Sequence, residues 1–273
     1  MTLSLAGPLL LVGAGKMGGA LLEGWLRQGL DPASVFVQDP APSQQVEALA
    51  RSHGIAVGTA PDLPAPPSIV VIAVKPQITD KVLPEVEPLL GEGSVVLSIA
   101  AGRTLESLSR HLPPGVAIVR AMPNTAASVG HSVTVACAND AVTRDQALEC
   151  NMLLEAVGEV VWIKDESLLD AVTAVSGSGP AYVFLLAECL AQAGRAAGLD
   201  HELASHLARA TVEGAGELLR RSDLSPAELR ENVTSPKGTT AAALEVLMGK
   251  DGFHDLLTRA VAAAAKRSRE LSS

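Results

Sequence analysis

The sequence predicts an α/β, Rossmann-type domain with a doubly wound, mostly parallel sheet over residues 1–163, followed by an all-α domain over residues 164–273. Three observations predict this fold. In the first part, short apolar runs alternate with helical patterns, which indicates βαβ units. A GxGxxG motif at residues 13–18 follows the first apolar run and opens a helix. From about Lys164 the strand signals end and only helical spacing continues.

In the first domain, strands are expected where short apolar runs are bounded by turn residues. These runs are Pro8–Val12, Val35–Gln38, Ile69–Val74, Ser94–Ile99, Val116–Val119, Ser132–Ala136 and Glu159–Ile163. Helical spacing covers Lys16–Gln28, Ser43–His53 and Arg144–Val157. The runs IVVIAV and VVLSI are apolar without alternation, which indicates strands covered on both faces, as in a parallel sheet. The Pro-rich stretch Pro61–Pro67 is expected to be a surface connection.

The second domain is predicted to contain helices alone. They are Pro180–Ala197, His201–Arg221, Pro226–Asn232, Thr239–Met248 and Phe253–Leu271. Many of these helices are Ala-rich with wide apolar faces, and such surfaces usually need a partner, so we expect an obligate oligomer. The most apolar stretch, Ala181–Leu199, is interrupted by charged and polar residues, and we expect a buried helix rather than a membrane span.

Composition excludes several classes of function. The net charge of −9 and the aromatic content of 2% argue against a nucleic-acid-binding protein. Three cysteines lie far apart with no pair at metal-ligand spacing, so neither a metal site nor a disulfide framework is expected. The segment Met1–Pro8 has no basic region before an apolar run and therefore predicts no signal peptide. Together these features predict a soluble protein of a reducing cytoplasm.

The GxGxxG motif predicts a dinucleotide site that takes NADH or NADPH. Gly13 permits the tight turn, Gly15 lets the pyrophosphate approach the backbone, and Gly18 lets the helix pack closely on the sheet. Lys16 and Met17 open the helix, where free N–H groups and the positive dipole end attract phosphate. The context of an apolar strand before the motif and a helix after it is what the motif requires.

Asp39 ends the second strand, and two interpretations of it stay open. An acidic residue there accepts the ribose hydroxyls of NAD and repels the extra phosphate of NADP. No Arg follows Asp39 within residues 41–45, so the sequence favours NADH. In the second interpretation, Asp39 only begins a turn before Pro40.

Two further loops follow strand carboxyl ends, the edge along which ligands lie in an open α/β sheet. Val74, Lys75 and Pro76 form one loop, and Lys75 is either a phosphate or ribose contact or a solvated lysine. Ala100 and Ala101 belong to the other loop, where small side chains let a flat nicotinamide ring lie against the backbone.

Two loops of the second domain are candidates for substrate binding. In SPKGTT at residues 235–240, Pro and Gly shape a turn and hydroxyls stand beside a helix start, which suits a carboxylate. The alternative is an ordinary N-cap threonine. In SGSGP at residues 176–180, Ser176 is either a ligand contact or part of a helix entry with Pro in the first turn.

Three longer strings are more specific. They are RAMPNT at 120–125, AVSGSGPAY at 174–182 and VTSPKGTT at 233–240. With GAGKMG and AVKPQ, they make the chain resemble the pyrroline-5-carboxylate reductase family from about residue 9 to residue 271. The resemblance implies an N-terminal Rossmann domain, a C-terminal helical domain that interlocks with its twin, and in many members a ring of dimers.

The resemblance also implies roles for individual residues. The SPGGTT-type loop of the family holds the substrate carboxylate, and a threonine near its end reaches the imine nitrogen. Matched here, the carboxylate residues are Ser235, Lys237, Gly238 and Thr239, and Thr240 is the catalytic threonine. Ser176 is expected at the substrate, and Asn124 at the cofactor. Lys237 departs from the usual Gly: it is strained if this position needs a positive φ, and otherwise its ammonium adds charge near the carboxylate.

The sequence therefore predicts hydride transfer from NAD(P)H to the imine carbon of 1-pyrroline-5-carboxylate, which forms L-proline. Hydroxyacid dehydrogenases of similar architecture carry a lysine early in the helix that follows the SGSGP loop. Residues 181–186 contain none, which counts against alcohol substrates because an alkoxide needs an acid. Two alternatives stay open: a reductase of another cyclic imine acid, such as the six-membered homologue, and a nucleotide-sensing protein without turnover.

Overall fold

The computed structural model describes residues 3–60 and 62–272. The first two residues of the Met1–Pro8 segment and the first residue of the expected connection Pro61–Pro67 lie outside this description. Contacts divide the chain into two units, of which the first comprises Met1–Gly177 and Ala265–Ser273 and the second comprises Ser178–Ala264.

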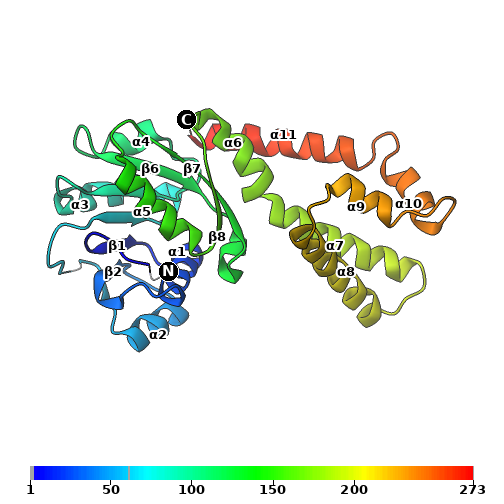
Figure 1. The fold of residues 1–273 in the computed structure, drawn as a ribbon, viewed down its shortest axis with the longest axis horizontal. Coiled ribbons are helices and arrows are strands. Elements are labelled where there is room, and N and C mark those ends of the chain that lie inside the picture. Colours follow the sequence, from blue (N-terminus) through cyan, green and yellow to red (C-terminus); the bar gives the residue numbers. More distant parts are fainter. Residues whose placement is uncertain (1–2, 61, 273) are drawn as a thin grey trace. The chain divides into compact units, whose positions relative to one another are not determined.

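An eight-stranded sheet forms the centre of the first unit, with the strand order β3-β2-β1-β4-β5-β6-β7-β8 (Figure 1). The strands are β1 Leu9–Val12, β2 Val35–Gln38, β3 Val57–Gly58, β4 Ile69–Ile72, β5 Val95–Ser98, β6 Ala117–Met122, β7 Ser132–Ala138 and β8 Gly158–Trp162. All neighbouring pairs are parallel except β6 and β7, which are antiparallel. The predicted doubly wound, mostly parallel sheet is thus confirmed.

Helices cover both faces of this sheet. They are α1 Lys16–Arg27, α2 Gln44–His53, α3 Thr79–Val86, α4 Leu105–Ser109, α5 Arg144–Glu155 and α6 Leu169–Val172. In β1, Leu9 and Leu11 belong to the core under α1, α2 and α5, whereas Leu10 and Val12 belong to the core under α3 and α4. Because successive side chains of a strand point to opposite faces, a strand that is apolar throughout serves both cores.

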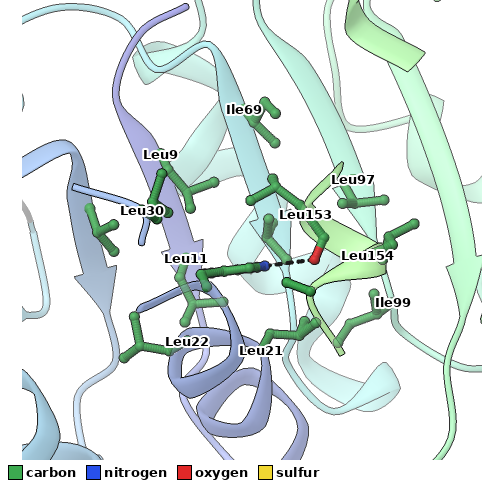
Figure 2. Packing of buried hydrophobic residues seen from close by; sticks show 14 of the residues in the cluster. Leu9, Leu11, Leu21, Leu22, Leu30, Ile69, Leu97, Ile99, Leu153 and Leu154 are labelled. Atoms are coloured by element: carbon green, nitrogen blue, oxygen red, sulfur yellow. Dashed lines mark hydrogen bonds between the residues drawn. The ribbon is translucent and has the colours of Figure 1, made fainter. Parts of the chain in front are cut away.

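The larger core is closed by a polar contact as well as by apolar packing (Figure 2). Trp25 of α1 is completely buried, and its indole Nε1 donates a 2.8 Å hydrogen bond to the carbonyl oxygen of Leu153 in α5. A buried indole N–H needs such a partner, so the bond also fixes α1 against α5. This pair of helices holds the Gly-rich turn, from which α1 starts, rigidly against the sheet.

The first unit extends beyond residue 163, at which we expected the Rossmann domain to end. Leu169 of α6 is fully buried and packs with Val135 and Cys137 of β7. The hydroxyl of Ser268, near the end of α11, donates a 2.6 Å hydrogen bond to the carboxylate of Asp170. Apolar burial and this bond join the residues after the last strand, and the end of the chain's last helix, to the sheet.

The second unit is helical, as predicted. Its helices are α7 Gly179–Ala196, α8 His201–Arg221, α9 Pro226–Asn232, α10 Thr239–Leu247 and the first part of α11 Phe253–Ser272. α7 and α8 pack as a hairpin in which Ala204 and Ala208 are buried (Figure 1). The bounds match the predicted helices within about two residues, the usual uncertainty of helix ends.

The expectation that Ala181–Leu199 is a buried helix is wrong for the single chain. No residue of α7 is buried, and Phe184 and Leu185 are exposed by 68% and 57%. The continuous helical stretch Glu166–Ala196 is long and apolar enough to cross a membrane by length and composition, with 6% of its most apolar window buried. Sequence periodicity could not show this exposure, because it reports an apolar face and not what covers that face.

Candidate functional site

The Gly-rich turn joins β1 to α1 at the carboxyl edge of the sheet. Gly13 has a φ of 89°, a left-handed conformation that favours glycine, and its N–H donates a 2.8 Å hydrogen bond to the carbonyl of Gln38. Gly15 is the N-cap residue of α1. No side chain caps the helix and no acidic residue stands in its first turn. The N–H groups of the first turn, to which Lys16 and Met17 belong, are therefore available to an anion.

The glycines of this turn differ in what surrounds them. A β-carbon on Gly18 would lie 2.1 Å from the carbonyl oxygen of Gly13, so the close packing expected of Gly18 is present. A β-carbon on Gly15 would meet nothing within 4 Å. The space beside Gly15 is thus open on the side where a pyrophosphate would approach. These features fit a dinucleotide, which needs free N–H groups and a backbone without side chains.

Asp39 follows β2 and contacts the Gly-rich turn directly. Its Oδ2 accepts a 2.7 Å hydrogen bond from the N–H of Ala14, and its Oδ1 accepts one of 2.8 Å from the N–H of Ala41. The second bond is the turn that the alternative interpretation predicts before Pro40. The bond from Ala14 is not part of that turn, and it places the carboxylate beside the Gly-rich turn that would hold the cofactor.

The loops after β4 and β5 also lie at this edge. Val74 and Pro76 are partly buried, and Lys75 is exposed. Ala100 is 4% exposed, whereas Ala101 is open to solvent. Parallel strands end on the same edge of a sheet, so the loops after β4 and β5 lie at the same edge as the Gly-rich turn after β1.

A salt bridge that sequence reasoning missed ties these two loops together. Arg103, just after the second loop, contacts the carboxylate of Asp80 in α3 with both terminal nitrogens, and His111 Nε2 lies 2.9 Å from Asp80 Oδ1. Burial raises the pKa of Asp80, but hydrogen bonds and charge from Arg103 and His111 outweigh it and leave that pKa below its usual value. The carboxylate therefore stays ionised and holds α3 near the second loop.

The same loop is supported from the end of the chain. Gly102 has a φ of 73°, and a β-carbon on it would lie 3.3 Å from the β-carbon of Leu271 in α11. The backbone after Ala101 is thus packed against the last turn of the protein. Nothing local in the sequence indicates this contact, because Gly102 and Leu271 are far apart in the sequence.

Asn124 and Ser176 are brought together. Asn124 is 9% exposed, and its Nδ2 donates a 3.2 Å hydrogen bond to the carbonyl oxygen of Ser176. Its Oδ1 accepts a bond of 3.0 Å from the N–H of Ala126. Ser176 lies in a π-helical turn, Thr173–Gly177, and its hydroxyl donates to the carbonyl of Val172. Such turns are rare and are frequent at functional sites. The observed contacts of Asn124 thus position the turn that carries Ser176.

A buried ion pair fixes the start of the helical part. Arg120 of β6 is 6% exposed, and its Nη1 lies 2.7 Å from Oε1 of Glu166. The same carboxylate oxygen accepts a 2.8 Å hydrogen bond from the N–H of Leu105, the first residue of α4. One side chain thereby joins a strand, a helix start and the chain after β8. The sequence shows Arg120 in the RAMPNT string but not its partner, which is 46 residues away.

The loop Ser235–Thr240 forms a turn followed by α10. The N–H of Gly238 donates a 3.0 Å hydrogen bond to the carbonyl of Ser235, and Gly238 is the N-cap of α10. Neither threonine is therefore the cap, which excludes the alternative of an ordinary N-cap threonine. Because glycine has no side chain to cap with, the first N–H groups of α10, those of Thr239 and Thr240 among them, remain available.

Within this loop Lys237 has a φ of 60°. Lys237 therefore has the left-handed conformation expected to strain it, and this backbone conformation does not prevent its ammonium from acting on a ligand. A left-handed conformation costs a residue with a β-carbon roughly 1–2 kcal/mol relative to its ordinary conformations. A β-carbon on Gly238 would lie 2.4 Å from the hydroxyl of Ser235, so the glycine after Lys237 is required by space.

Two family models match the chain. One is described as "NADP oxidoreductase coenzyme F420-dependent" and matches residues 9–102, which include the Gly-rich turn and the loops after β4 and β5. The other is described as "Pyrroline-5-carboxylate reductase dimerisation" and matches residues 166–271, which include the loop Ser235–Thr240. The apolar face that α7 exposes in the single chain thus lies in the region that matches the dimerisation model.

Several curated proteins similar to the chain are named pyrroline-5-carboxylate reductase. A pyrroline-5-carboxylate reductase from Pseudomonas aeruginosa is 39% identical over 261 residues, which cover 96% of this chain and 95% of that protein. One from Pisum sativum is 40% identical over 263 residues, which cover 96% of this chain and 94% of that protein. The similarity spans both units and is not confined to the dinucleotide motif.

Solved structures agree with the sequence relatives. A pyrroline-5-carboxylate reductase from Coxiella burnetii superposes with a TM-score of 0.91 at 33% identity, covering 98% of this chain and 100% of that chain. The pyrroline carboxylate reductase of Plasmodium falciparum, solved with NADP bound, superposes with a TM-score of 0.83 at 31% identity, covering 98% and 99%. Fold and sequence thus point to the same relatives.

Proposed function

Because this chain belongs to the pyrroline-5-carboxylate reductase family, it is an NAD(P)H-dependent oxidoreductase of proline biosynthesis, and we propose how its residues divide the work. The reaction joins a hydride and a proton to the C=N bond of 1-pyrroline-5-carboxylate and gives L-proline. The enzyme must bind a dinucleotide, hold the carboxylate of a small ring, and orient the ring nitrogen while the hydride is added to the neighbouring carbon. Separate sets of residues suit these three tasks.

The first set is proposed to hold the cofactor, which supplies the hydride when bound. The first-turn N–H groups of α1, including those of Lys16 and Met17, face the pyrophosphate, and Gly13, Gly15 and Gly18 keep the approach free of side chains. The loops with Val74, Lys75, Pro76, Ala100 and Ala101 hold the ribose and the nicotinamide. Asn124 is proposed as a further cofactor contact, and its hydrogen bond to Ser176 also positions the turn that carries Ser176.

Asp39 is proposed to set the choice between the two nicotinamide cofactors. The carboxylate is held beside the Gly-rich turn by Ala14 and is followed by no cation within residues 41–45. A fixed carboxylate accepts hydrogen bonds from the ribose hydroxyls and repels an additional phosphate, so NADH is favoured over NADPH. The Plasmodium falciparum relative was solved with NADP bound, and the two cofactors must therefore be compared directly for this chain.

The second set is proposed to hold the substrate carboxylate. The uncapped N–H groups of α10 and the hydroxyls of Ser235 and Thr239 suit a carboxylate, and the positive end of the helix dipole adds to the attraction. Gly238 is proposed to give the acid group access to the backbone, and Ser176 is proposed as a further substrate-binding residue. Lys237 belongs to this set by its position in the loop.

Thr240 is proposed to contact the imine nitrogen. The nitrogen of a cyclic imine can arrive protonated, in which case the hydride neutralises a cation and no strong acid is required. A hydroxyl that orients the nitrogen then supplies positioning, which accounts for much of the acceleration in reactions of this kind. This explains why the helix after Gly179 can lack the lysine that alcohol chemistry requires.

The assembly and the cell compartment follow from the same features. The dimerisation region supports a homo-oligomer, and we propose a dimer as the minimum with rings of dimers built from it. Three free cysteines without a disulfide are compatible with a reducing cytoplasm, where we place the enzyme.

The observation that carries the function is the near-full-length similarity to pyrroline-5-carboxylate reductases, and the SPKGTT loop lies within the region that the dimerisation model matches. The test follows NADH and NADPH oxidation with 1-pyrroline-5-carboxylate and counts the L-proline formed. One L-proline for each nicotinamide oxidised is expected. A wild-type enzyme that shows no imine-dependent oxidation with either cofactor would refute the function, and a much higher kcat/KM for the six-membered imine acid would reassign the substrate.

A further inference from the structure

The residues Ser235–Gly238 form a four-residue turn of a defined type. The carbonyl oxygen of Ser235 accepts a hydrogen bond from the N–H of Gly238. Pro236 is the second residue of the turn, and Lys237 is the third, with a φ of 60°. Proline in the second place and a positive φ in the third are the features of a type II turn, whose third place is normally Gly or Asn. Lysine is therefore the residue that this turn chemistry disfavours.

The rest of the fold shows how unusual this choice is. Among the residues that the structure describes, eight glycines have a positive φ, and the residues other than glycine in this conformation are Lys237 and Asp251. Aspartate is one of the few residues with a β-carbon that tolerates it. At Lys237 alone, a long cationic side chain is kept where glycine would remove the conformational cost. A benefit of the side chain itself would account for its presence.

No salt bridge among the described residues accounts for such a benefit. The Lys237 side chain is exposed, and none of these salt bridges includes it. In sequence it stands two residues before Thr239, the first residue of α10, whose N-terminus has no acidic residue in its first turn. The ammonium and the positive end of the helix dipole thus belong to one short segment, and no negative side chain of that first turn offsets them.

We propose that Lys237 is a specificity-determining residue, whose ammonium attracts the carboxylate of the imine substrate and selects acid-bearing rings over uncharged ones. The proposal rests on the proposed role of the Ser235–Thr240 loop. Backbone N–H groups bind the acid group through hydrogen bonds, and the ammonium adds a charge that acts over a longer distance and is screened by salt. The conformational cost of the turn is the cost of keeping this charge in place.

The test compares two substrates that differ only in the acid group, 1-pyrroline-5-carboxylate and 1-pyrroline. Lys237→Met removes the charge and keeps the β-carbon, Lys237→Gly removes the charge and the conformational cost, and Lys237→Arg restores a cation. Lys250→Gln, which removes an exposed positive charge beyond the far end of α10, is the matched control. Steady-state constants are measured for each variant at low and high salt, and circular dichroism verifies the fold.

With 1-pyrroline-5-carboxylate, Lys237→Met and Lys237→Gly are expected to raise KM about fivefold, the scale of one partly exposed charge interaction. At high salt this rise in KM should disappear, and with 1-pyrroline it should be absent at any salt concentration. Lys237→Arg should have a KM close to that of the wild type, and Lys250→Gln should have the wild-type KM. An unchanged KM in Lys237→Met would overturn the proposal, since the charge would then have no effect. A raised KM in Lys237→Met together with a wild-type KM in Lys237→Gly would also overturn it, since the backbone and not the charge would then matter. In either case the wild type still makes proline, so the proposed function stands apart from this result.

Discussion

The N–H of Ala14 donates a 2.7 Å hydrogen bond to the carboxylate of Asp39, which joins the Gly-rich turn after β1 to the end of β2. The two residues are 25 positions apart in sequence and follow the neighbouring parallel strands β1 and β2. We therefore propose two tasks for this carboxylate: it stabilises the Gly-rich turn, and it presents a negative charge where we expect the ribose.

Substitution of Asp39 separates the two tasks. Asp39→Asn keeps an acceptor for Ala14 and loses the charge, whereas Asp39→Ser shortens the side chain as well. Both are expected to lower the ratio of kcat/KM for NADH to kcat/KM for NADPH by roughly tenfold, equivalent to about 1.4 kcal/mol. Only Asp39→Ser should also weaken the binding of both NADH and NADPH, because its shorter side chain supports the Gly-rich turn less well. A wild type that prefers NADPH, or an unchanged ratio in Asp39→Asn, would show that Asp39 only supports the turn.

Gly15→Ala and Gly18→Ala are expected to fail in different ways. A β-carbon on Gly15 meets nothing within 4 Å, so Gly15→Ala should keep the wild-type Tm and lose cofactor affinity because the methyl group occupies the pyrophosphate approach. A β-carbon on Gly18 would lie 2.1 Å from the carbonyl of Gly13, so Gly18→Ala should lower the Tm as well. Thermal melts and cofactor titrations distinguish the two. Equal cofactor affinity in Gly15→Ala and the wild type would contradict the site.

Glu166→Ala is expected to destabilise the first unit. The change leaves Arg120 buried without its partner and removes the acceptor of the Leu105 N–H. Breaking a buried ion pair costs several kcal/mol, and because the Glu166 side chain is 27% exposed we expect about 2 kcal/mol in urea unfolding. The exposed pair Arg110–Glu106 is the control, and Glu106→Ala should cost less than about 0.5 kcal/mol. Equal losses in the two variants would show that the Arg120 pair contributes little.

The buried thiols are expected to resist alkylation. Burial raises the pKa of Cys137 to about 11, to which the charge of Glu166 adds while Arg120 opposes it. Burial likewise raises the pKa of Cys150 to about 12, with a smaller rise from Glu149. Because the thiolate is the nucleophile, iodoacetamide at pH 8 should modify neither cysteine in the folded enzyme and both in urea. Rapid modification of either in the folded state would mean that the core opens locally.

The strands could be predicted because burial on both faces leaves a direct mark on the sequence. IVVIAV and VVLSI contain no polar alternation, and the strands within them, β4 and β5, are buried at every residue. The helices α3 and α4 were not predicted, since α3 contains Pro84 and α4 is five residues long. Neither offers enough turns for a period of 3.6 residues to be recognised.

The site could be predicted where it depends on backbone chemistry. Gly13, Gly18 and Gly238 are glycines for reasons of conformation or space, and these reasons leave a motif in the sequence. The contacts of Glu166 with Arg120, of Arg103 with Asp80 and of Leu271 with Gly102 could not be predicted. Each joins residues distant in the chain through tertiary packing, which no local pattern encodes.

The measurement that tests the account most directly is the kcat of Thr240 variants with 1-pyrroline-5-carboxylate at saturating cofactor. Thr240→Val removes the hydroxyl and keeps the shape, and we expect kcat to fall at least tenfold, within the range of a positioned proton-transfer or orienting group. Thr240→Ser, which keeps a hydroxyl, should recover most of the rate, and both variants should melt within about 2 °C of the wild type, as expected for a change without a large effect on stability. A Thr240→Val enzyme with the wild-type kcat and KM would contradict the claim that this loop acts on the substrate.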